Sequence, residues 1–392
     1  MINYDSILSD KVKEMKPSGI RKFFDLAANT EGVISLGVGE PDFQTPWAVR
    51  KKALDVLERK RMIYSANPGL TELREEISRY LNRKYSLSYD PKGEVIVTVG
   101  GSEAIDLAIR ALVNPGDEVL IVEPCFVCYK PIVELMHGKA ISISTKLENR
   151  FKLTPEELRA HLTDRTKLLI LPYPNNPTGG IMTREDLEAI AEVLRDTNVM
   201  VLSDEIYSEL TYGRKHCSIA EIDGMWERTI YVSGFSKAFA MTGWRLGYVC
   251  APQPIAAQML KIHQYAIMCA PTMSQHAAIV ALCECDDEVE KMVVEYNVRR
   301  RVLVEGFNRI GLTCFEPEGA FYVFPCIKST GLSSEEFCAR LLEEEKVAVV
   351  PGNAFGESGE GFVRVSYAYS LKHLLDALSC IERFVKRHAG GE

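Results

Sequence analysis

Short apolar runs alternate along most of the chain with segments of helical periodicity. Continuous runs of Val, Ile and Leu are typical of strands that are buried on both faces of a parallel sheet. Between them, the segment 46–61 carries Ala53, Leu54 and Leu57 on one stripe, as an amphipathic helix does. The pattern predicts an α/β domain with a mostly parallel sheet between helices. The predicted strands are 95–99, 118–122, 167–171, 229–233 and 246–251, with a further one inside 198–207.

The pattern changes after about residue 285, where a long charged amphipathic helix is predicted at 287–307. A chain of 392 residues is long enough for two domains. We expect an N-terminal arm with part of a small domain at 1–45, a large domain at 46–285 and a small α+β C-terminal domain at 286–392. The smaller predicted elements are a short helix opened by Pro17 and Ser18, strands at 33–36, 318–324, 347–351 and 361–367, and a helix at 334–344.

Composition restricts the class of protein. The hydrophobic fraction of 46% and the charged fraction of 26% exclude general disorder, and no apolar run approaches the ~18 residues of a membrane span. The first residues have neither the basic flank nor the apolar core of a secretory signal, so we expect a cytoplasmic protein. A net charge of -8 without a basic block argues against nucleic acid as a partner.

The cysteines indicate a reducing compartment rather than a metal site. Eleven are scattered through the chain, and the closest pairs are Cys125 with Cys128 and Cys283 with Cys285. A zinc site usually needs a second pair or histidines at matching offsets, which the sequence lacks. We therefore expect reduced thiols and no bound metal.

The segment from Ser233 to Gly247 carries the most specific chemistry. It places Lys237 among small and apolar residues, beside the hydroxyl of Ser236 and eight residues before Arg245. Partial desolvation shifts a lysine amine towards the neutral form, which condenses with an aldehyde to give a Schiff base. A hydroxyl and a guanidinium suit a phosphate dianion. Because pyridoxal 5′-phosphate carries both an aldehyde and a phosphate, the segment predicts this cofactor.

The same string, Ser-Lys-x-Phe-x-Met-Thr-Gly-Trp-Arg-x-Gly, resembles the lysine motif of the class I/II pyridoxal-phosphate-dependent aminotransferases. The resemblance covers about residues 15 to 385, is nearest to the prokaryotic aspartate and aromatic group, and includes further motifs in the family's order. It implies fold type I, with a seven-stranded, mostly parallel sheet, and a homodimer with active sites shared across the interface. The further motifs are a glycine loop at 37–39, Tyr-x-x-x-x-Gly-x-x-x-Leu-Arg at 64–74, Gly-Gly at 100–101, Asn-Pro-x-Gly at 176–179, Asp-Glu-x-Tyr at 204–207 and x-x-Arg-x-Ser around 364.

The resemblance also implies a role for single residues. Lys237 would be the catalytic residue, Asp204 would pair with the ring nitrogen of the cofactor, and Tyr207 would donate to its ring oxygen. Phe126 would stack on the ring, and Asn176 would contact both the ring hydroxyl and the substrate carboxylate. The substrate carboxylate would be bound by Gly39, Asn176 and Arg364. The other implied cofactor ligands, mainly at the phosphate, are Gly101, Ser102, Glu103, Ser236 and Arg245, with Tyr64 reaching from the neighbouring subunit.

One position departs from the family pattern. Relatives often carry a serine or threonine three residues before the lysine as a phosphate ligand, and this chain has Gly234 there. We therefore expect the phosphate to be bound by the other residues of the pattern, Ser236, Arg245, Ser102 with the backbone of its turn, and Tyr64 of the neighbouring subunit.

The implied function is transamination between an L-amino acid and a 2-oxo acid, through a Lys237 Schiff base. Aspartate or an aromatic amino acid is the favoured donor and 2-oxoglutarate the favoured acceptor. Two alternatives remain open: a carbon-sulfur lyase or cyclopropane-forming synthase of the same fold, and a non-catalytic cofactor-binding regulator. For the substrate side chain, Arg21 or Lys22 would suit a distal carboxylate, and Ile20, Phe23 and Tyr265 would suit an aromatic ring.

Overall fold

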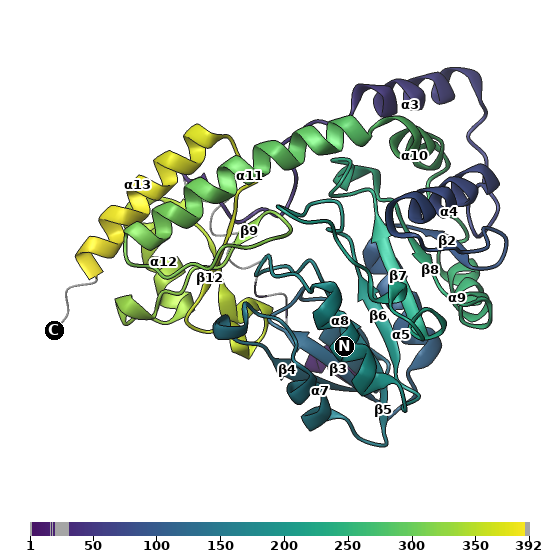
Figure 1. Ribbon diagram of the computed structural model, residues 1–392, viewed down its shortest axis with the longest axis horizontal. Helices are drawn as coiled ribbons and strands as arrows, with labels where there is room; N and C mark the ends of the chain where they lie inside the picture. Colours follow the sequence, from purple (N-terminus) through teal and green to yellow (C-terminus); the bar gives the residue numbers. More distant parts are fainter. Residues whose placement is uncertain (1, 16, 18, 20–30, 389–392) are drawn as a thin grey trace.

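A seven-stranded sheet forms the centre of the computed structural model, which describes residues 2–15, 17, 19 and 31–388. Its strands lie in the order β2-β8-β7-β6-β5-β3-β4, and β8 runs antiparallel to both of its neighbours (Figure 1). The strands from β7 to β4 in this order run parallel. The predicted mostly parallel seven-stranded sheet is confirmed. The strands are β2 Val95–Thr98, β3 Glu118–Glu123, β4 Lys139–Ser144, β5 Thr166–Leu171, β6 Met200–Asp204, β7 Thr229–Gly234 and β8 Gly247–Cys250.

Helices cover both faces of this sheet, which explains why its central strands are continuously apolar. On one face, alternate strand residues such as Ile121 and Ile170 pack with α5, α6 and α9. On the other face, the intervening residues such as Leu120 and Leu169 pack with α7 and α8, and those of β2 and β8 pack with α4 and α10. The helices are α3 Trp47–Arg59, α4 Thr71–Tyr85, α5 Gly101–Leu112, α6 Tyr129–Leu135, α7 Pro155–His161, α8 Arg184–Leu194, α9 Gln253–Ala266 and α10 Thr272–Glu284.

Three α-helices of the described chain begin at capping boxes that can be found in the sequence. Thr154 with Glu157 starts α7, Thr183 with Asp186 starts α8, and Ser333 with Glu336 starts α12 (Ser334–Glu345). In each pair the hydroxyl accepts a first-turn N–H, and the carboxylate accepts the N–H of the capping residue. Helix α5 differs because its N-cap is Gly100, which has no side chain to satisfy those N–H groups.

A second group of elements is formed by the C-terminal part of the chain together with a short N-terminal strand. β1 (Ile34–Ser35) pairs in parallel with β10 (Val347–Ala348), and β12 (Val363–Ser366) lies between β11 (Val350–Pro351) and β9 (Tyr322–Val323). Helix α11 (Asp286–Arg309) runs from the neighbourhood of α10 to that of α13 (Leu371–His388), which packs with α12 (Ser334–Glu345) (Figure 1). The domain boundaries expected at 45 and 285 stay a prediction.

Some elements differ from the sequence-based expectation. The edge strand β4 was not expected, since its residues are mostly half-buried and give no continuous apolar run. The expected strand at 318–324 contains only the two residues of β9, because Ala320 takes a left-handed conformation with φ of 57° and ends regular pairing there. The expected edge at 347–351 is two strands in two different sheets.

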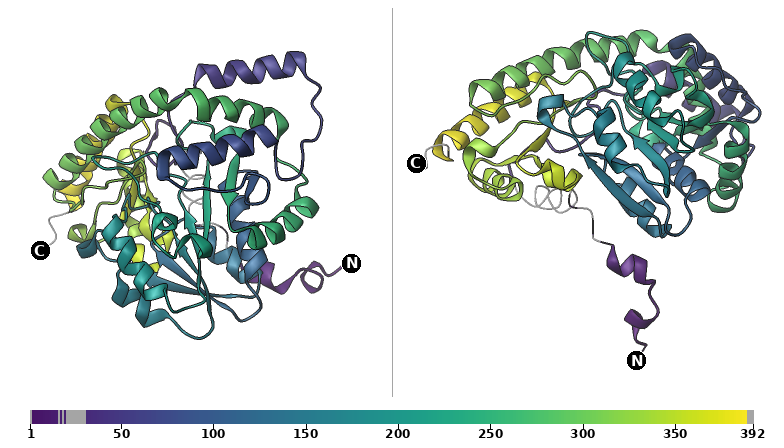
Figure 2. Two further views of the ribbon diagram at one scale, coloured as in Figure 1. Left: turned by 45° about the vertical axis from the view of Figure 1, so that its right-hand side comes forward. Right: turned by 60° about the horizontal axis from the view of Figure 1, so that its bottom comes forward.

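The N-terminal helix expected after Pro17 lies outside the described residues. Before it, α1 (Asp10–Glu14) consists of exposed or half-buried residues and projects from the body of the molecule (Figure 2). Among the described helices, none has both the length and the apolar composition needed to cross a bilayer.

Candidate active site

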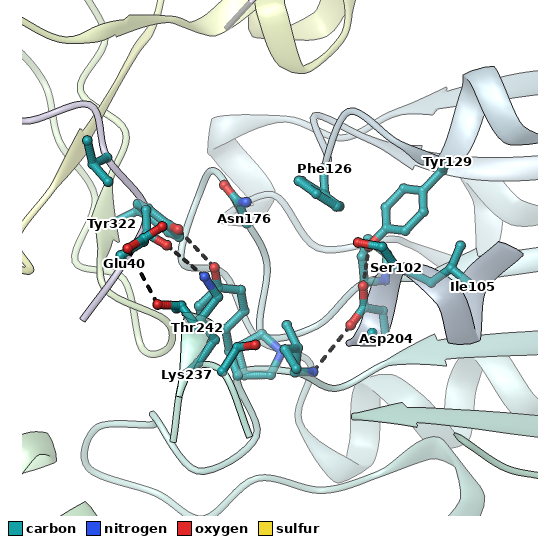
Figure 3. A pocket seen from close by; sticks show the side chains of 18 of the residues that line it. Glu40, Ser102, Ile105, Phe126, Tyr129, Asn176, Asp204, Lys237, Thr242 and Tyr322 are labelled. Carbon is teal, nitrogen blue, oxygen red and sulfur yellow. Dashed lines mark hydrogen bonds between the residues drawn. The ribbon is translucent and has the colours of Figure 1, made fainter. Parts of the chain in front are cut away.

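A cavity of about 640 Å³ lies at the carboxyl ends of the parallel strands (Figure 3). Its wall contains residues that end or follow β2, β3, β5, β6 and β7, which is where open α/β sheets place their ligands. The segment 38–40 and two residues of the smaller sheet, Tyr322 and Arg364, complete the wall. The cavity therefore brings together parts of the chain that are far apart in sequence.

Lys237 follows β7 and extends into this cavity. Its Nζ donates a hydrogen bond to the carbonyl of Gly39 at 2.6 Å and lies 5.7 Å from the ring centres of Tyr207 and Phe321. Burial lowers the pKa of Lys237 to about 8, aided by the charges of Arg364 and Arg245 and opposed by those of Glu40 and Asp204. About a tenth of this amine is therefore neutral at pH 7, far more than for an ordinary lysine, and the neutral form is the one that acts as a nucleophile or accepts a proton.

Asp204 ends β6, and only 7% of it is exposed. Its carboxylate accepts hydrogen bonds from the hydroxyl of Tyr129 at 2.6 Å and from the backbone N–H of Ile206 at 3.2 Å (Figure 3). Burial raises the pKa of Asp204, whereas these two hydrogen bonds lower it. No cation among the described residues forms an ion pair with this carboxylate, so the cavity offers a buried acceptor for a positively charged ligand atom.

Tyr207 and Tyr322 meet across the cavity. Their hydroxyl oxygens are 2.8 Å apart, and either one can be the donor. Gly39 lies against Tyr322 so closely that a Cβ at this position would be 2.4 Å from the tyrosine oxygen. A larger residue at position 39 would therefore have to displace either Tyr322 or the segment 38–40.

Arg364 comes from β12 and is 3% exposed. It donates to Oδ1 of Asn176 at 2.9 Å and to the carbonyl of Gly37, and it lies against the rings of Tyr322 and Phe355. Within the described part of the chain, its Nε has no hydrogen-bond partner and its charge has no carboxylate partner. A buried guanidinium in this state has capacity for an anionic ligand, for which carboxylate geometry is well suited.

The opposite end of the cavity contains the start of α5 and Arg245. Arg245 donates to the carbonyl of Thr242 at 3.2 Å, and its guanidinium lies against Gly100, where an added Cβ would be 2.8 Å from Nη2. Gly101, Ser102 and Ser236 line the cavity beside it. First-turn N–H groups, hydroxyls and a guanidinium together form a donor set that suits a phosphate.

The structure brings most of the predicted site residues into this one cavity. Those that line it are Gly39, Gly101, Ser102, Phe126, Asn176, Asp204, Tyr207, Ser236, Lys237, Arg245 and Arg364. Tyr64 does not line it and is 78% exposed. Glu103 does not line it either, because its carboxylate turns to Val99 and His263. Any contact of Glu103 with a ligand in this cavity is therefore restricted to its backbone.

Several residues of the wall were missed in the sequence. Tyr129 lies three positions after Phe126, and nothing in that spacing indicates that its hydroxyl reaches Asp204. Tyr322, Glu40 and Thr242 are further examples, with Thr242 donating to Glu40 at 3.4 Å. Glu205, next to Asp204, is part of a separate buried network with Ser203, Ser218 and His216.

The departure at Gly234 has a packing reason. A Cβ there would lie 2.9 Å from the Cα of Gly247 on the neighbouring strand, so two glycines allow β7 and β8 to approach closely. Elsewhere, the described residues contain no cluster of three or more His, Cys, Asp or Glu side chains that is placed to hold a metal ion. All eleven cysteines, each within the described ranges, have free thiols.

Comparisons with known proteins give the class of this enzyme. Residues 31–380 match the family described as aminotransferase class I and II. The chain is 55% identical to YugH of Bacillus subtilis over 382 residues, which cover 97% of this chain and 99% of YugH. It is 46% identical to the aspartate aminotransferase of Pyrococcus abyssi over 385 residues, which cover 97% and 98%. The solved aromatic aminotransferase of Pyrococcus horikoshii superposes with a TM-score of 0.90 at 43% identity, covering 94% and 99%.

The chain therefore belongs to the aminotransferase class I and II family, and it is an aminotransferase. The family resemblance, the fold and the enzyme class predicted from the sequence are confirmed. Members of this family generally depend on pyridoxal phosphate. The roles predicted for single residues stay predictions.

Proposed function

We propose that this aminotransferase binds pyridoxal 5′-phosphate in the cavity and moves an amino group from an L-amino acid to a 2-oxo acid. The observation that supports this most directly is that Lys237 and Arg364 line the same cavity. One cavity is lined both by a lysine whose pKa is lowered to about 8 and by a buried guanidinium that has no carboxylate partner among the described residues. An amine that reacts in its neutral form and a cation without a protein anion suit a substrate that carries both an amino group and a carboxylate.

The residues of the wall fit the proposed cofactor. Arg245, Ser236 and the first turn of α5 would hold its phosphate, and the missing Cβ of Gly100 leaves room for the Arg245 guanidinium beside that turn. Asp204 would pair with the protonated ring nitrogen, which stabilises the ionised form of a buried carboxylate. Phe126 would stack on the cofactor ring, and Asn176 and Tyr207 would contact the hydroxyl oxygen of that ring. When bound, the cofactor supplies an aldehyde that condenses with amines and a ring that accepts electrons from the substrate Cα.

The chain itself would supply orientation and proton transfer. Arg364, with Asn176 and the backbone of Gly39, would hold the substrate carboxylate and so fix the direction of the Cα–H bond. The neutral amine of Lys237 would then accept the Cα proton as a general base. After release of the first 2-oxo acid, the same groups act in reverse on a second one. Asp204 would remain ionised throughout because its partner is a cation.

For the substrate, we propose aspartate or an aromatic amino acid as donor and 2-oxoglutarate as acceptor. The support is the names of two relatives, the aspartate aminotransferase of Pyrococcus abyssi and the aromatic aminotransferase of Pyrococcus horikoshii. Of the residues considered for the substrate side chain, Arg21, Lys22, Ile20 and Phe23 lie outside the described residues. Tyr265 is 93% exposed and lies outside the cavity wall, which argues against its role as an aromatic wall within one chain.

We also propose a cytoplasmic homodimer with shared active sites. Tyr64 supports the sharing, since its side chain is exposed and lies outside the wall of its own chain's cavity. In a dimer, it would reach the phosphate in the neighbouring subunit.

The proposal is tested by absorption spectroscopy of the purified protein after pyridoxal phosphate is added and the excess removed. We expect bound cofactor whose visible absorption changes with aspartate or phenylalanine and returns with 2-oxoglutarate, with one 2-oxo acid formed per amino group transferred. The Lys237→Ala variant should not show this cycle. If the parent protein retains no cofactor, or if ammonia is released in place of a new amino acid, transamination is contradicted. Either result would favour one of the two alternatives, the non-catalytic regulator or the lyase.

A further inference from the structure

We propose that Glu103 and His263 form a positioning pair that holds the turn before α5 in the shape required to bind the cofactor phosphate. This inference rests on the proposed function, because the phosphate is that of pyridoxal phosphate. It assigns Glu103 a role behind the turn in place of direct ligation. It also assigns a role to His263, a residue of α9 that belongs to none of the motifs of the site.

One carboxylate connects the turn to a neighbouring helix. Glu103 accepts the backbone N–H of Val99 with Oε2, and its Oε1 lies 2.6 Å from Nδ1 of His263. Val99 directly precedes Gly100 and Gly101, and Glu103 directly follows Ser102, so the carboxylate bridges the two ends of the turn. His263 is fully buried in α9, which packs against α5. The bridge is thereby fixed to a second element of the core.

The turn needs such support because its N-cap is glycine. Gly100 has a φ of 79°, a conformation that glycine adopts readily. Fixing a glycine in one conformation, however, costs more backbone entropy than fixing any other residue. In an ordinary capping box, the acidic residue at the third helical position accepts the N–H of the N-cap residue. Glu103 occupies that third position and accepts the N–H one residue earlier. Because Gly100 has no side chain that could accept them, the first-turn N–H groups are left available for an anion.

The bonding of His263 supports a positioning role. Within the described residues, the His263 ring bonds only to Glu103, and its Nε2 is buried without a partner. Burying a histidine ring with only one hydrogen bond costs free energy of folding, which is explained if that hydrogen bond has a role. The carboxylate also lies outside the cavity wall, so its negative charge is directed away from the place where the phosphate would bind. His263, whose Nδ1 makes the short contact with this carboxylate, also lies outside the cavity wall.

The test compares two ligands that differ only in the phosphate. Dissociation constants for pyridoxal phosphate and for pyridoxal are measured by absorption titration on the apoprotein, for the parent and for Glu103→Ala, Glu103→Gln and His263→Phe. We expect Glu103→Ala to weaken pyridoxal phosphate binding about tenfold or more, the factor that the loss of a buried hydrogen bond gives, and pyridoxal binding less than about twofold. Glu103→Gln should lie between, since its amide oxygen can still accept the N–H of Val99.

The matched control is Asp106→Asn, which removes a carboxylate from the same helix. Asp106 pairs with Arg110 at 2.7 Å and does not contact the turn. It should leave the ratio of the two dissociation constants within about twofold of the parent, because the ratio reports only phosphate contacts. Inorganic phosphate should compete with pyridoxal phosphate on the parent and on Asp106→Asn at lower concentrations than on Glu103→Ala.

Equal losses for both ligands in Glu103→Ala and His263→Phe would overturn the inference and leave a purely structural pair. The inference would also be overturned if Glu103→Ala, Glu103→Gln and His263→Phe all kept the parent's ratio of the two dissociation constants. Thermal unfolding of each apoprotein identifies a variant that fails to fold, and Glu103→Gln, the mildest change, then decides. If the parent itself does not bind pyridoxal phosphate, the proposed function fails. If the parent binds it and the variants keep the parent's ratio of the two dissociation constants, only the inference about Glu103 and His263 fails.

Discussion

At the scale of single residues, burial sets the chemistry of Lys237. Its pKa is lowered from an ordinary value of 10.5 to about 8, so the neutral amine becomes the major form only above about pH 8. The rate at which the apoprotein reacts with pyridoxal phosphate should therefore rise with pH and level off above about 8. Stopped-flow absorption across this range measures it. A rate that still rises steeply towards pH 10.5 would contradict the lowered pKa, and Lys237→Ala should not react.

Tyr129 tunes a second titrating group. Its hydroxyl donates to Asp204, a contact that lowers the pKa of that carboxyl against the effect of burial. In Tyr129→Phe the pKa of Asp204 should rise, so that the ionised form is lost at a higher pH as the solution is acidified. We expect the acidic limb of the kcat/KM profile to move up by about one pH unit. Tyr231→Phe is the control, because Tyr231 is also fully buried but lies outside the cavity wall; an equal shift there would refute the assignment.

Arg364 offers planar, two-pronged donation that a lysine cannot copy. Arg364→Lys keeps the positive charge but removes the fork held by Asn176 and Gly37. We expect kcat/KM for every donor to fall about a hundredfold, the result of losing roughly two charge-assisted hydrogen bonds. Steady-state kinetics measures this. Arg300→Lys is the comparison, since Arg300 is 6% exposed yet lies outside the cavity, and it should change thermal stability more than kcat/KM.

At the scale of elements, the approach of the segment 38–40 to β9 depends on a missing side chain. A Cβ at Gly39 would lie 2.4 Å from the oxygen of Tyr322, so Gly39→Ala must displace one of them. A displacement of this size should lower kcat/KM about tenfold or more. The double variant Gly39→Ala with Tyr322→Phe removes the clashing oxygen and should recover part of the loss relative to Gly39→Ala. No recovery would mean that the loop is constrained in another way.

The predicted elements were most accurate where local pattern and burial coincide. Buried strands β2, β3, β5, β6, β7 and β8 were found from their apolar runs, and α11 from its amphipathic period. Prediction failed at β4 because its pairing depends on a neighbour and not on its own composition, and the strand containing β9 was predicted too long because Ala320 takes a left-handed conformation. β4 exists as an edge strand because β3 pairs with it along six residues, from Glu118 with Lys139 to Glu123 with Ser144.

At the scale of the whole molecule, the proposed dimer has a specific consequence for mixed subunits. Tyr64→Ala should bind cofactor weakly and Lys237→Ala should be inactive. If Tyr64 serves the neighbouring subunit, unfolding the two variants together and refolding them gives mixed dimers that contain one site with both residues intact. Activity should then exceed that of either variant refolded alone, while sedimentation gives twice the mass of one chain. No recovery in a mixture that does form dimers would place Tyr64 outside the partner's site.

The sequence alone determined the alternation of strands and helices, the family motifs and eleven of the residues that line the cavity. These features depend on residue type at fixed spacing, which a strand, a turn or a helix start translates directly into local geometry. Only the tertiary structure decided that Glu103 turns to His263, that Tyr129 reaches Asp204 across 75 positions and that Arg364 has a free Nε. Those contacts depend on the order of strands in the large sheet, on how α9 packs against α5 and on the pairing of β12 in the smaller sheet, none of which a local pattern specifies.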